Sequence, residues 1–209
     1  MKNLIIILGV IVAFVFGIVM FAIASYNNLV NLQQGVDAQW AQVQNVYQRR
    51  ADLIPNLVST VSGAANFEKS TLIAVTDARA SVGRVNIDAS KAPTDATQLA
   101  AFDQAQGQLT SALSRLLVVS ENYPQLRATD NFQTLQAQLE GTENRISVER
   151  GRFNDIVQAY DSAIKRVPAV FFAAAFGFKD HPYFQATAGA ETAPKVQFDF
   201  SSSATATQH

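Results

Sequence analysis

An uninterrupted apolar run near the N-terminus constrains this chain more than any other feature. The run from Leu4 to Ala24 contains no charged or strongly polar side chain. As a helix rising about 1.5 Å per residue it would be roughly 31 Å long, close to the hydrocarbon thickness of a bilayer. The sequence therefore predicts a transmembrane anchor within residues 1–25, in contact with membrane lipid through residues 4–24.

A cleavable signal peptide is the alternative interpretation of the same run. Lys2 precedes it, and Ala22 and Ala24 satisfy the small-residue rule for a cleavage site. The apolar region of a signal peptide is usually about 7–15 residues long, which is shorter than this run. The length therefore favours a retained anchor.

The distribution of basic residues predicts how a retained anchor is oriented. Lys2 and the amino terminus precede the run, whereas residues 25–44 contain no Lys or Arg. By the positive-inside rule, this asymmetry places the N-terminus in the cytoplasm. In a bacterium, it predicts a single-pass protein of the inner membrane whose soluble domain is periplasmic rather than cytoplasmic.

The remainder of the chain is long enough for one domain with its own core. Its charges nearly cancel, with 16 basic and 17 acidic residues in the whole chain, and no basic run occurs. Nucleic acid is therefore not an expected partner. The chain has no cysteine, which excludes disulfides, thiolate metal sites and a cysteine nucleophile.

Apolar residues recur at helical spacing through four long segments. The first stripe meets no proline before Pro55, which predicts one rod from Leu4 to Ser62 with a kink near that proline. Three more long helices and one short helix are predicted at 66–82, 96–122, 130–167 and 169–176. The predicted fold class is all-α: the transmembrane helix continues into an antiparallel four-helix bundle over residues 26–185.

Local signals predict where several of these helices begin and end. Gly83 is a predicted terminator of the second helix. Thr94 or Asp95 is the predicted N-cap of the third helix, and Thr129 or Asp130 is that of the fourth.

The composition changes after the predicted bundle. Residues 186–209 are dominated by Ala, Thr, Ser and Gly, which predicts a disordered tail. Within the tail, Val196, Phe198 and Phe200 alternate with polar residues, as in a short strand that could add to a sheet edge of a partner. Incidental aromatic residues in a disordered tail are the alternative.

Several long motifs occur in the order typical of one known family. They cover Tyr47 to Val61 (YQRRADLIPNLVSTV), Leu113 to Leu126, Asn131 to Arg145, and the stretch from Arg152 through Gly177. In these motifs the chain resembles the LemA family of bacterial membrane-anchored helical proteins, over roughly residues 4–185. The resemblance implies an N-terminal membrane helix and an antiparallel helical bundle. It implies no particular reaction.

The side-chain patterns of common catalytic and metal sites do not stand out in this sequence. A di-iron bundle needs Glu-x-x-His pairs on its helices, and none occurs here. Glu140 and Glu143 could meet a cation, but helix-surface pairing explains them as well. A serine or threonine hydrolase would need His181 as its base. We therefore predict no cofactor, no metal and no enzymatic activity.

Arg50 is the most informative polar residue, because it falls on the apolar stripe of the first helix. Arg49, Asp52, Pro55 and Asn56 lie beside it. A buried arginine requires a partner, since an unpaired buried charge is costly. One interpretation is an ion pair that fixes helix register, and the other is a recognition patch at the kinked helix. The candidate partners are Glu121, Glu143 and Glu149.

Aromatic residues are predicted mainly as core. Trp40 lies on the same apolar stripe, and the segment from Phe171 to Phe184 is dense in aromatic rings. That segment is predicted either to cap the base of the bundle or to expose a patch to another subunit or to the membrane surface. The full set of candidate structural and interaction residues is Trp40, Arg49, Arg50, Asp52, Pro55, Asn56, Glu121, Tyr123, Pro124, Glu143, Phe153, Asn154 and Tyr160.

These observations predict a membrane-anchored helical scaffold without catalysis of its own. Such a chain would assemble into a homo-oligomer at the bacterial envelope, because an anchor confines all copies to one plane and one orientation. The alternative is an adaptor that binds a membrane protease, a transporter or their substrates through the helix kink and the tail.

Overall fold

The computed structural model describes residues 2–63, 67–85, 87–88 and 90–185. Over these residues the fold is all-α, and no strand is present among them. The predicted fold class is therefore confirmed. The predicted tail, with its strand at Val196 to Phe200, lies outside the described residues. The helices are α1 Lys2–Ser62, α2 Lys69–Arg84, α3 Ala96–Ser120, α4 Pro124–Arg127, α5 Asp130–Lys165 and α6 Ala169–Ala173.

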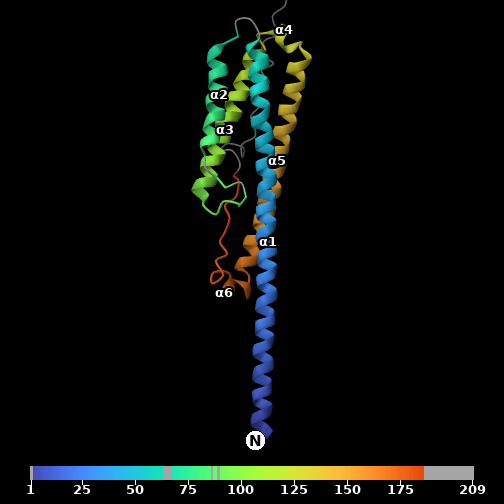
Figure 1. The fold of residues 1–209 in the computed structure, drawn as a ribbon, viewed down its shortest axis with the longest axis vertical. Coiled ribbons are helices and arrows are strands. Elements are labelled where there is room, and N and C mark those ends of the chain that lie inside the picture. The colour runs from blue at the N-terminus through green and yellow to red at the C-terminus, as the bar shows by residue number, and fades with distance from the viewer. Residues whose placement is uncertain (1, 64–66, 86, 89, 186–209) are drawn as a thin grey trace, which may run out of the picture.

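The long helices alternate in direction and pack as two pairs. α1 packs along α5, and α2 packs along α3. Figure 1 shows that α1 extends far beyond the bundle at its N-terminal end, while α4 lies at the opposite tip.

α1 is one continuous helix that joins the apolar run to the bundle. Residues 2–21 are exposed along their whole length, and Leu29 is the first buried residue. The helix contains a candidate membrane span near the N-terminus by length and composition. Pro55 lies inside α1 without dividing it, so the two parts predicted to form a single rod do so.

The predicted N-caps of the third and fourth helices are confirmed. The Asp95 side chain accepts from the amide of Thr97 at 2.8 Å, and the Thr129 hydroxyl accepts from the amide of Phe132 at 3.4 Å. Each cap satisfies an amide that the first helical turn leaves without a backbone acceptor.

Several predicted helix ends are wrong by a few residues. α2 passes through Gly83 to Arg84 because a glycine inside a helix is unfavourable by only about 1 kcal/mol. α3 ends at Ser120 rather than at Asn122. Pro124, predicted only as a break, begins the short α4 because proline fits the first turn of a helix. α6 ends at Ala173 rather than Phe176.

The buried side chains form two clusters stacked along the bundle. The proximal cluster, nearer the candidate span, is Leu29, Val36, Trp40, Val43, Tyr47, Ala92, Leu99, Phe102, Ile146, Phe153, Val157, Tyr160, Ile164, Ala173 and Phe184. The distal cluster is Ile54, Leu57, Val61, Val75, Leu109, Leu113, Leu116, Leu126, Phe132 and Leu139. On α1, Arg50 lies between Tyr47 of the proximal cluster and Ile54 of the distal cluster.

Candidate functional site

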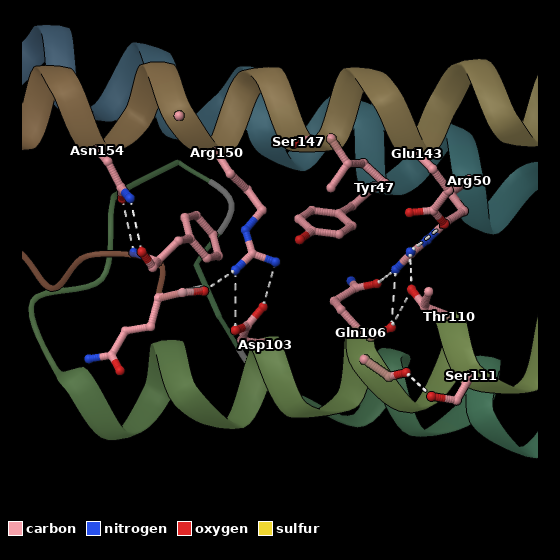
Figure 2. Close-up of a pocket in the computed structure, with 15 residues that line it drawn as sticks. Tyr47, Arg50, Asp103, Gln106, Thr110, Ser111, Glu143, Ser147, Arg150 and Asn154 are labelled. Carbon is pink, nitrogen blue, oxygen red and sulfur yellow. Dashed lines mark hydrogen bonds and ion pairs between the residues drawn. The ribbon is translucent and has the colours of Figure 1, made fainter. Parts of the chain in front are cut away.

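A polar cavity of about 680 Å³ opens between α3 and α5 beside the C-terminal third of α1. Two arginine–carboxylate pairs line it, and Figure 2 shows them on either side of Tyr47. Gly107 on α3 and Gly151 on α5 also line the cavity, and a side chain at either position would have open space around its Cβ. The two glycines leave the cavity open, although the backbone conformation does not require glycine at either position.

The Arg50 guanidinium is fixed by partners from two other helices. Its Nη1 donates to Glu143 Oε1 at 2.7 Å and to the Thr110 hydroxyl at 2.8 Å. Its Nη2 donates to the side-chain oxygen of Gln106. The Arg50 side chain is 2% exposed, whereas that of Glu143 is 34% exposed. The charge is therefore buried on one side of the pair and partly solvated on the other.

Arg150 forms the second pair, on the side of the proximal cluster. Its Nη1 lies 2.9 Å from Asp103 Oδ1, and its Nη2 donates to the carbonyl of Gln185 at 3.0 Å. The guanidinium also lies 4.5 Å from the centroid of the Phe184 ring, a cation–π contact. Arg150 thereby links α3, α5 and the segment that follows α6.

Tyr47 separates the two pairs. Its ring lies 5.1 Å below the Arg50 guanidinium carbon and packs edge-on against Phe102. Burial raises the pKa of the Tyr47 phenol, since the phenolate would lose its hydration, although the Arg150 and Arg50 charges partly oppose this. The phenol is therefore neutral at physiological pH.

The cavity holds charged groups that neutralise one another and lacks an assembled nucleophile. Its lining includes no histidine, and the hydroxyl of Ser111 donates to the Gly107 carbonyl at 3.0 Å. A serine nucleophile needs a base within hydrogen-bond reach. The arrangement instead fixes the mutual register of α1, α3 and α5.

His181, the base that a hydrolase would require, lies outside this cavity, where its hydrogen bonds connect distant segments of the chain. It is 2% exposed. Its Nδ1 lies 2.9 Å from the Pro93 carbonyl, so this nitrogen donates, and Nε2 accepts from Gln33 at 3.0 Å. Its backbone amide donates to the Asp161 carboxylate at 3.3 Å. With both ring nitrogens occupied, His181 joins the last described segment to α1, α5 and the α2–α3 connection.

Metal ligation finds no support in the described part of the chain. No group of three or more His, Asp or Glu residues lies close enough there to hold an ion. Glu143 is engaged by Arg50, and Glu140 accepts from Gln136 at 3.0 Å.

The structure brings the predicted interaction residues of α1 and α5 into two different environments. Trp40, Phe153 and Tyr160 are buried in the proximal cluster. The Trp40 ring nitrogen donates to the Asp88 carbonyl at 3.2 Å. Asn154 makes a reciprocal pair with the Phe184 backbone, with both distances 2.9 Å. These contacts join α1 and α5 to the non-helical segments of the fold.

Other predicted residues lie on the surface and are not brought together. Arg49 is exposed, and Asp52 accepts from Gln48 at 2.7 Å within the same helix. Glu121 is exposed at the end of α3, so among the three candidate partners Arg50 pairs with Glu143 alone. The remaining residues lie outside this site: Asn56, whose carbonyl accepts from Thr60, Pro55 inside α1, and Tyr123 and Pro124 at the start of α4.

Sequence reasoning missed the residues that complete the site on α3. Asp103, Gln106 and Thr110 are spaced by three and four positions, so they share one face of that helix. Asp103 and Thr110 directly follow the buried Phe102 and Leu109, so this polar stripe runs alongside the apolar one. It was the available signal that a buried arginine would find its partners there.

The fold and this site define a class: a helix-bundle protein with a candidate N-terminal membrane span and an internal ion-pair layer. The chain belongs to the LemA family, whose model matches residues 39–198. It is 26% identical over 186 residues to magnetosome protein MamQ 2 of Paramagnetospirillum magneticum, covering 80% of this chain and 67% of that protein. It is 25% identical, with the same coverage, to magnetosome protein MamQ of Magnetospirillum gryphiswaldense.

Proposed function

We propose that this protein is a membrane-anchored scaffold that self-assembles through copies held in one plane, without catalysis of its own. The observation that carries the proposal is the continuity of α1 from the exposed apolar run into the core of the bundle. A helix that leaves the membrane without a hinge transmits its orientation to the bundle. Copies anchored in this way present the same faces to one another at the same height.

The cavity supports a structural role for the bundle in this proposal. The two terminal nitrogens of the buried Arg50 are engaged by α3 and α5, and Asp52 accepts from Gln48. Arg49 is therefore the exposed basic charge that remains of the recognition patch predicted at the helix kink. The adaptor alternative consequently depends on the tail. Deleting residues 186–209 tests it, because a scaffold keeps its copy number without the tail and an adaptor loses its partner.

The proposed assembly predicts more than two copies in detergent. Light scattering of the full-length protein measures the copy number, and a monodisperse monomer would refute self-assembly. Gly9 and Gly17 are exposed on the apolar run, where small residues let membrane helices approach closely. We expect Gly9→Leu/Gly17→Leu to lower the copy number, and Val10→Leu/Ile18→Leu, the matched control, to leave it unchanged.

The proposed location is the bacterial inner membrane with the bundle in the periplasm. Because the chain has no cysteine, Ala128→Cys at the exposed end of α4 provides a single label site. A membrane-impermeant maleimide should modify it in intact spheroplasts. Labelling only after lysis would place the bundle in the cytoplasm, and a native N-terminus at Ser25 would show that the run is a cleaved signal peptide.

A further inference from the structure

The segment around α6 exposes apolar side chains at the end of the bundle nearest the N-terminal extension of α1. Val167, Phe171 and Phe176 are 75%, 71% and 53% exposed, and Val170 lies between them at 39%. These four residues are named the α6 patch. Figure 1 shows α6 beside α1 at the end of the bundle nearest the N-terminal extension. Monomeric domains rarely leave such large apolar side chains together in water.

The α6 patch lies level with the end of the apolar run. The Phe176 ring is 5.0 Å from the Tyr26 ring, centroid to centroid. Tyr26 follows Ala24, the last residue of the run, by two positions, which is roughly 3 Å along the helix. α1 is fully exposed up to Phe21, and partial burial begins at Ala22. A membrane that contains the run would therefore meet the α6 patch at its surface.

The opposite face of α6 holds the patch in place. Ala173 is buried in the proximal cluster, and Phe178 packs against the same cluster. Gly177 adopts a φ of +81°, which favours glycine, as the chain turns back, and the Phe178 amide donates to the Ala173 carbonyl at 3.0 Å. The patch is therefore a fixed surface of the bundle.

Basic side chains flank the α6 patch. Arg166 precedes it and Lys179 follows it, and both are exposed. Lys165 is compensated by Asp180 at 2.7 Å, which leaves an excess of positive charge around the apolar residues. Aromatic and apolar residues bordered by Lys and Arg are the composition that binds the headgroup region of an anionic membrane.

We propose that the α6 patch inserts into the lipid leaflet from which α1 emerges, so that the bundle contacts the membrane at two points. This inference rests on the proposed membrane anchoring of α1. A second copy of the chain is a less suitable occupant, because a protein partner would not require the patch to coincide in height with the end of the apolar run. The second contact would fix the tilt and rotation of the bundle relative to the membrane.

Quenching by brominated lipid tests the depth of the α6 patch. Full-length Phe171→Trp protein is reconstituted at low density into vesicles of phosphatidylcholine and phosphatidylglycerol carrying bromine near the top of the acyl chains. Trp40 is fully buried and lies about 24 Å along α1 beyond Ala24, so the wild-type signal supplies the baseline. We expect the fluorescence added by Phe171→Trp to be quenched about twofold or more, as for an indole at the interface.

Two matched variants separate the possible outcomes. Val118→Trp places an indole at an exposed site on α3, near its distal end, and should not be quenched. Phe21→Trp, in the apolar run and three residues before its end, should be quenched if α1 is anchored. Quenching of Phe21→Trp without quenching of Phe171→Trp would overturn the second contact alone, including the case in which a second copy covers the patch. Failure of Phe21→Trp would overturn the anchoring itself.

The charges give an independent readout of the same contact. Quenching of Phe171→Trp should be stronger with anionic phosphatidylglycerol than with phosphatidylcholine alone. Adding Arg166→Gln and Lys179→Gln should remove this lipid dependence. A lipid dependence that survives both substitutions would contradict the role assigned to these two side chains.

Discussion

In the proximal cluster the Trp40 ring contacts the rings of Phe102, Phe153 and Phe184, with centroid distances of 5.7, 5.6 and 6.2 Å. The rings of Phe153 and Phe184 also contact each other, at 5.6 Å. The distal cluster contains Leu, Ile and Val side chains and a single buried ring, Phe132. The two clusters also differ in what surrounds them. Hydrogen bonds to the backbone of non-helical segments hold those segments against the proximal cluster, whereas every residue of the distal cluster lies in a helix.

This difference shows how one bundle combines two kinds of packing. Aliphatic side chains fill space with little directional demand, so a distal core of leucines tolerates changes that preserve volume. Aromatic rings prefer defined mutual angles, and Trp needs an acceptor for its N–H group. The proximal cluster therefore fixes one arrangement of the chain close to the proposed membrane surface, and the distal cluster mainly stabilises the helices.

The largest expected effect comes from removing the centre of the proximal cluster. Trp40→Ala should lower the free energy of unfolding by about 3–5 kcal/mol, because it leaves a cavity among three rings and frees the Asp88 carbonyl. Circular dichroism during urea unfolding of the detergent-solubilised protein measures this. Trp40→Phe keeps much of the ring and should lose only about 1–2 kcal/mol.

The distal cluster supplies the comparison for that variant. Leu116 is fully buried, and Leu116→Met should cost less than about 1.5 kcal/mol because volume is nearly preserved. It should leave the fluorescence of Trp40 unchanged. A loss for Leu116→Met as large as that for Trp40→Phe, together with altered Trp40 fluorescence in Leu116→Met, would contradict the separation of the two clusters.

In the ion-pair layer between the clusters, substituting Glu143 and substituting Arg50 should lower the free energy of unfolding by unequal amounts. Glu143→Gln leaves the buried Arg50 without a counter-charge and should cost about 2–3 kcal/mol. Arg50→Met should cost about 1 kcal/mol, because the carboxylate of Glu143 is one-third exposed and keeps access to water. Urea unfolding measures both values. A larger loss for Arg50→Met would show that the arginine's packing matters more than its charge.

A smaller, local effect is expected where hydrogen bonds hold the Phe184 backbone against the proximal cluster. Asn154→Ala removes both hydrogen bonds to the Phe184 backbone and should cost about 1–2 kcal/mol. Hydrogen exchange at the Phe184 amide should accelerate before the helices open. Asn144→Ala, at an exposed position of the same helix, is the control. Equal protection of this amide in both variants would show that other contacts hold the Phe184 segment in place.

The smallest effect at neutral pH is that of Tyr160, whose contribution changes only at high pH. Burial raises the pKa of Tyr160 to about 12, whereas an unfolded phenol titrates near pH 10. Between these values the unfolded chain releases a proton that the folded chain keeps, so the free energy of unfolding falls as pH rises from about 10 to 12. Tyr160→Phe should flatten part of this decline. An unchanged slope would assign the decline to other groups.

Much of the architecture could be predicted because it depends on local periodicity. The apolar run, the stripe from Val36 to Val61 and the caps at Asp95 and Thr129 each depend on residues a few positions apart. The helix ends at Gly83 and Asn122 were less predictable, because neighbouring packing decides whether a helix continues for one more turn.

Local patterns along the chain are enough to specify an N-terminal segment long and apolar enough for a bilayer, helical stripes for four long helices and an arginine that needs a partner. The packing of the helices was needed to show that the partner is Glu143, that His181 connects distant segments and that the α6 patch lies level with Tyr26. Helical periodicity depends on residues a few positions apart, whereas these contacts join positions separated by 93, 88 and 150 residues along the chain.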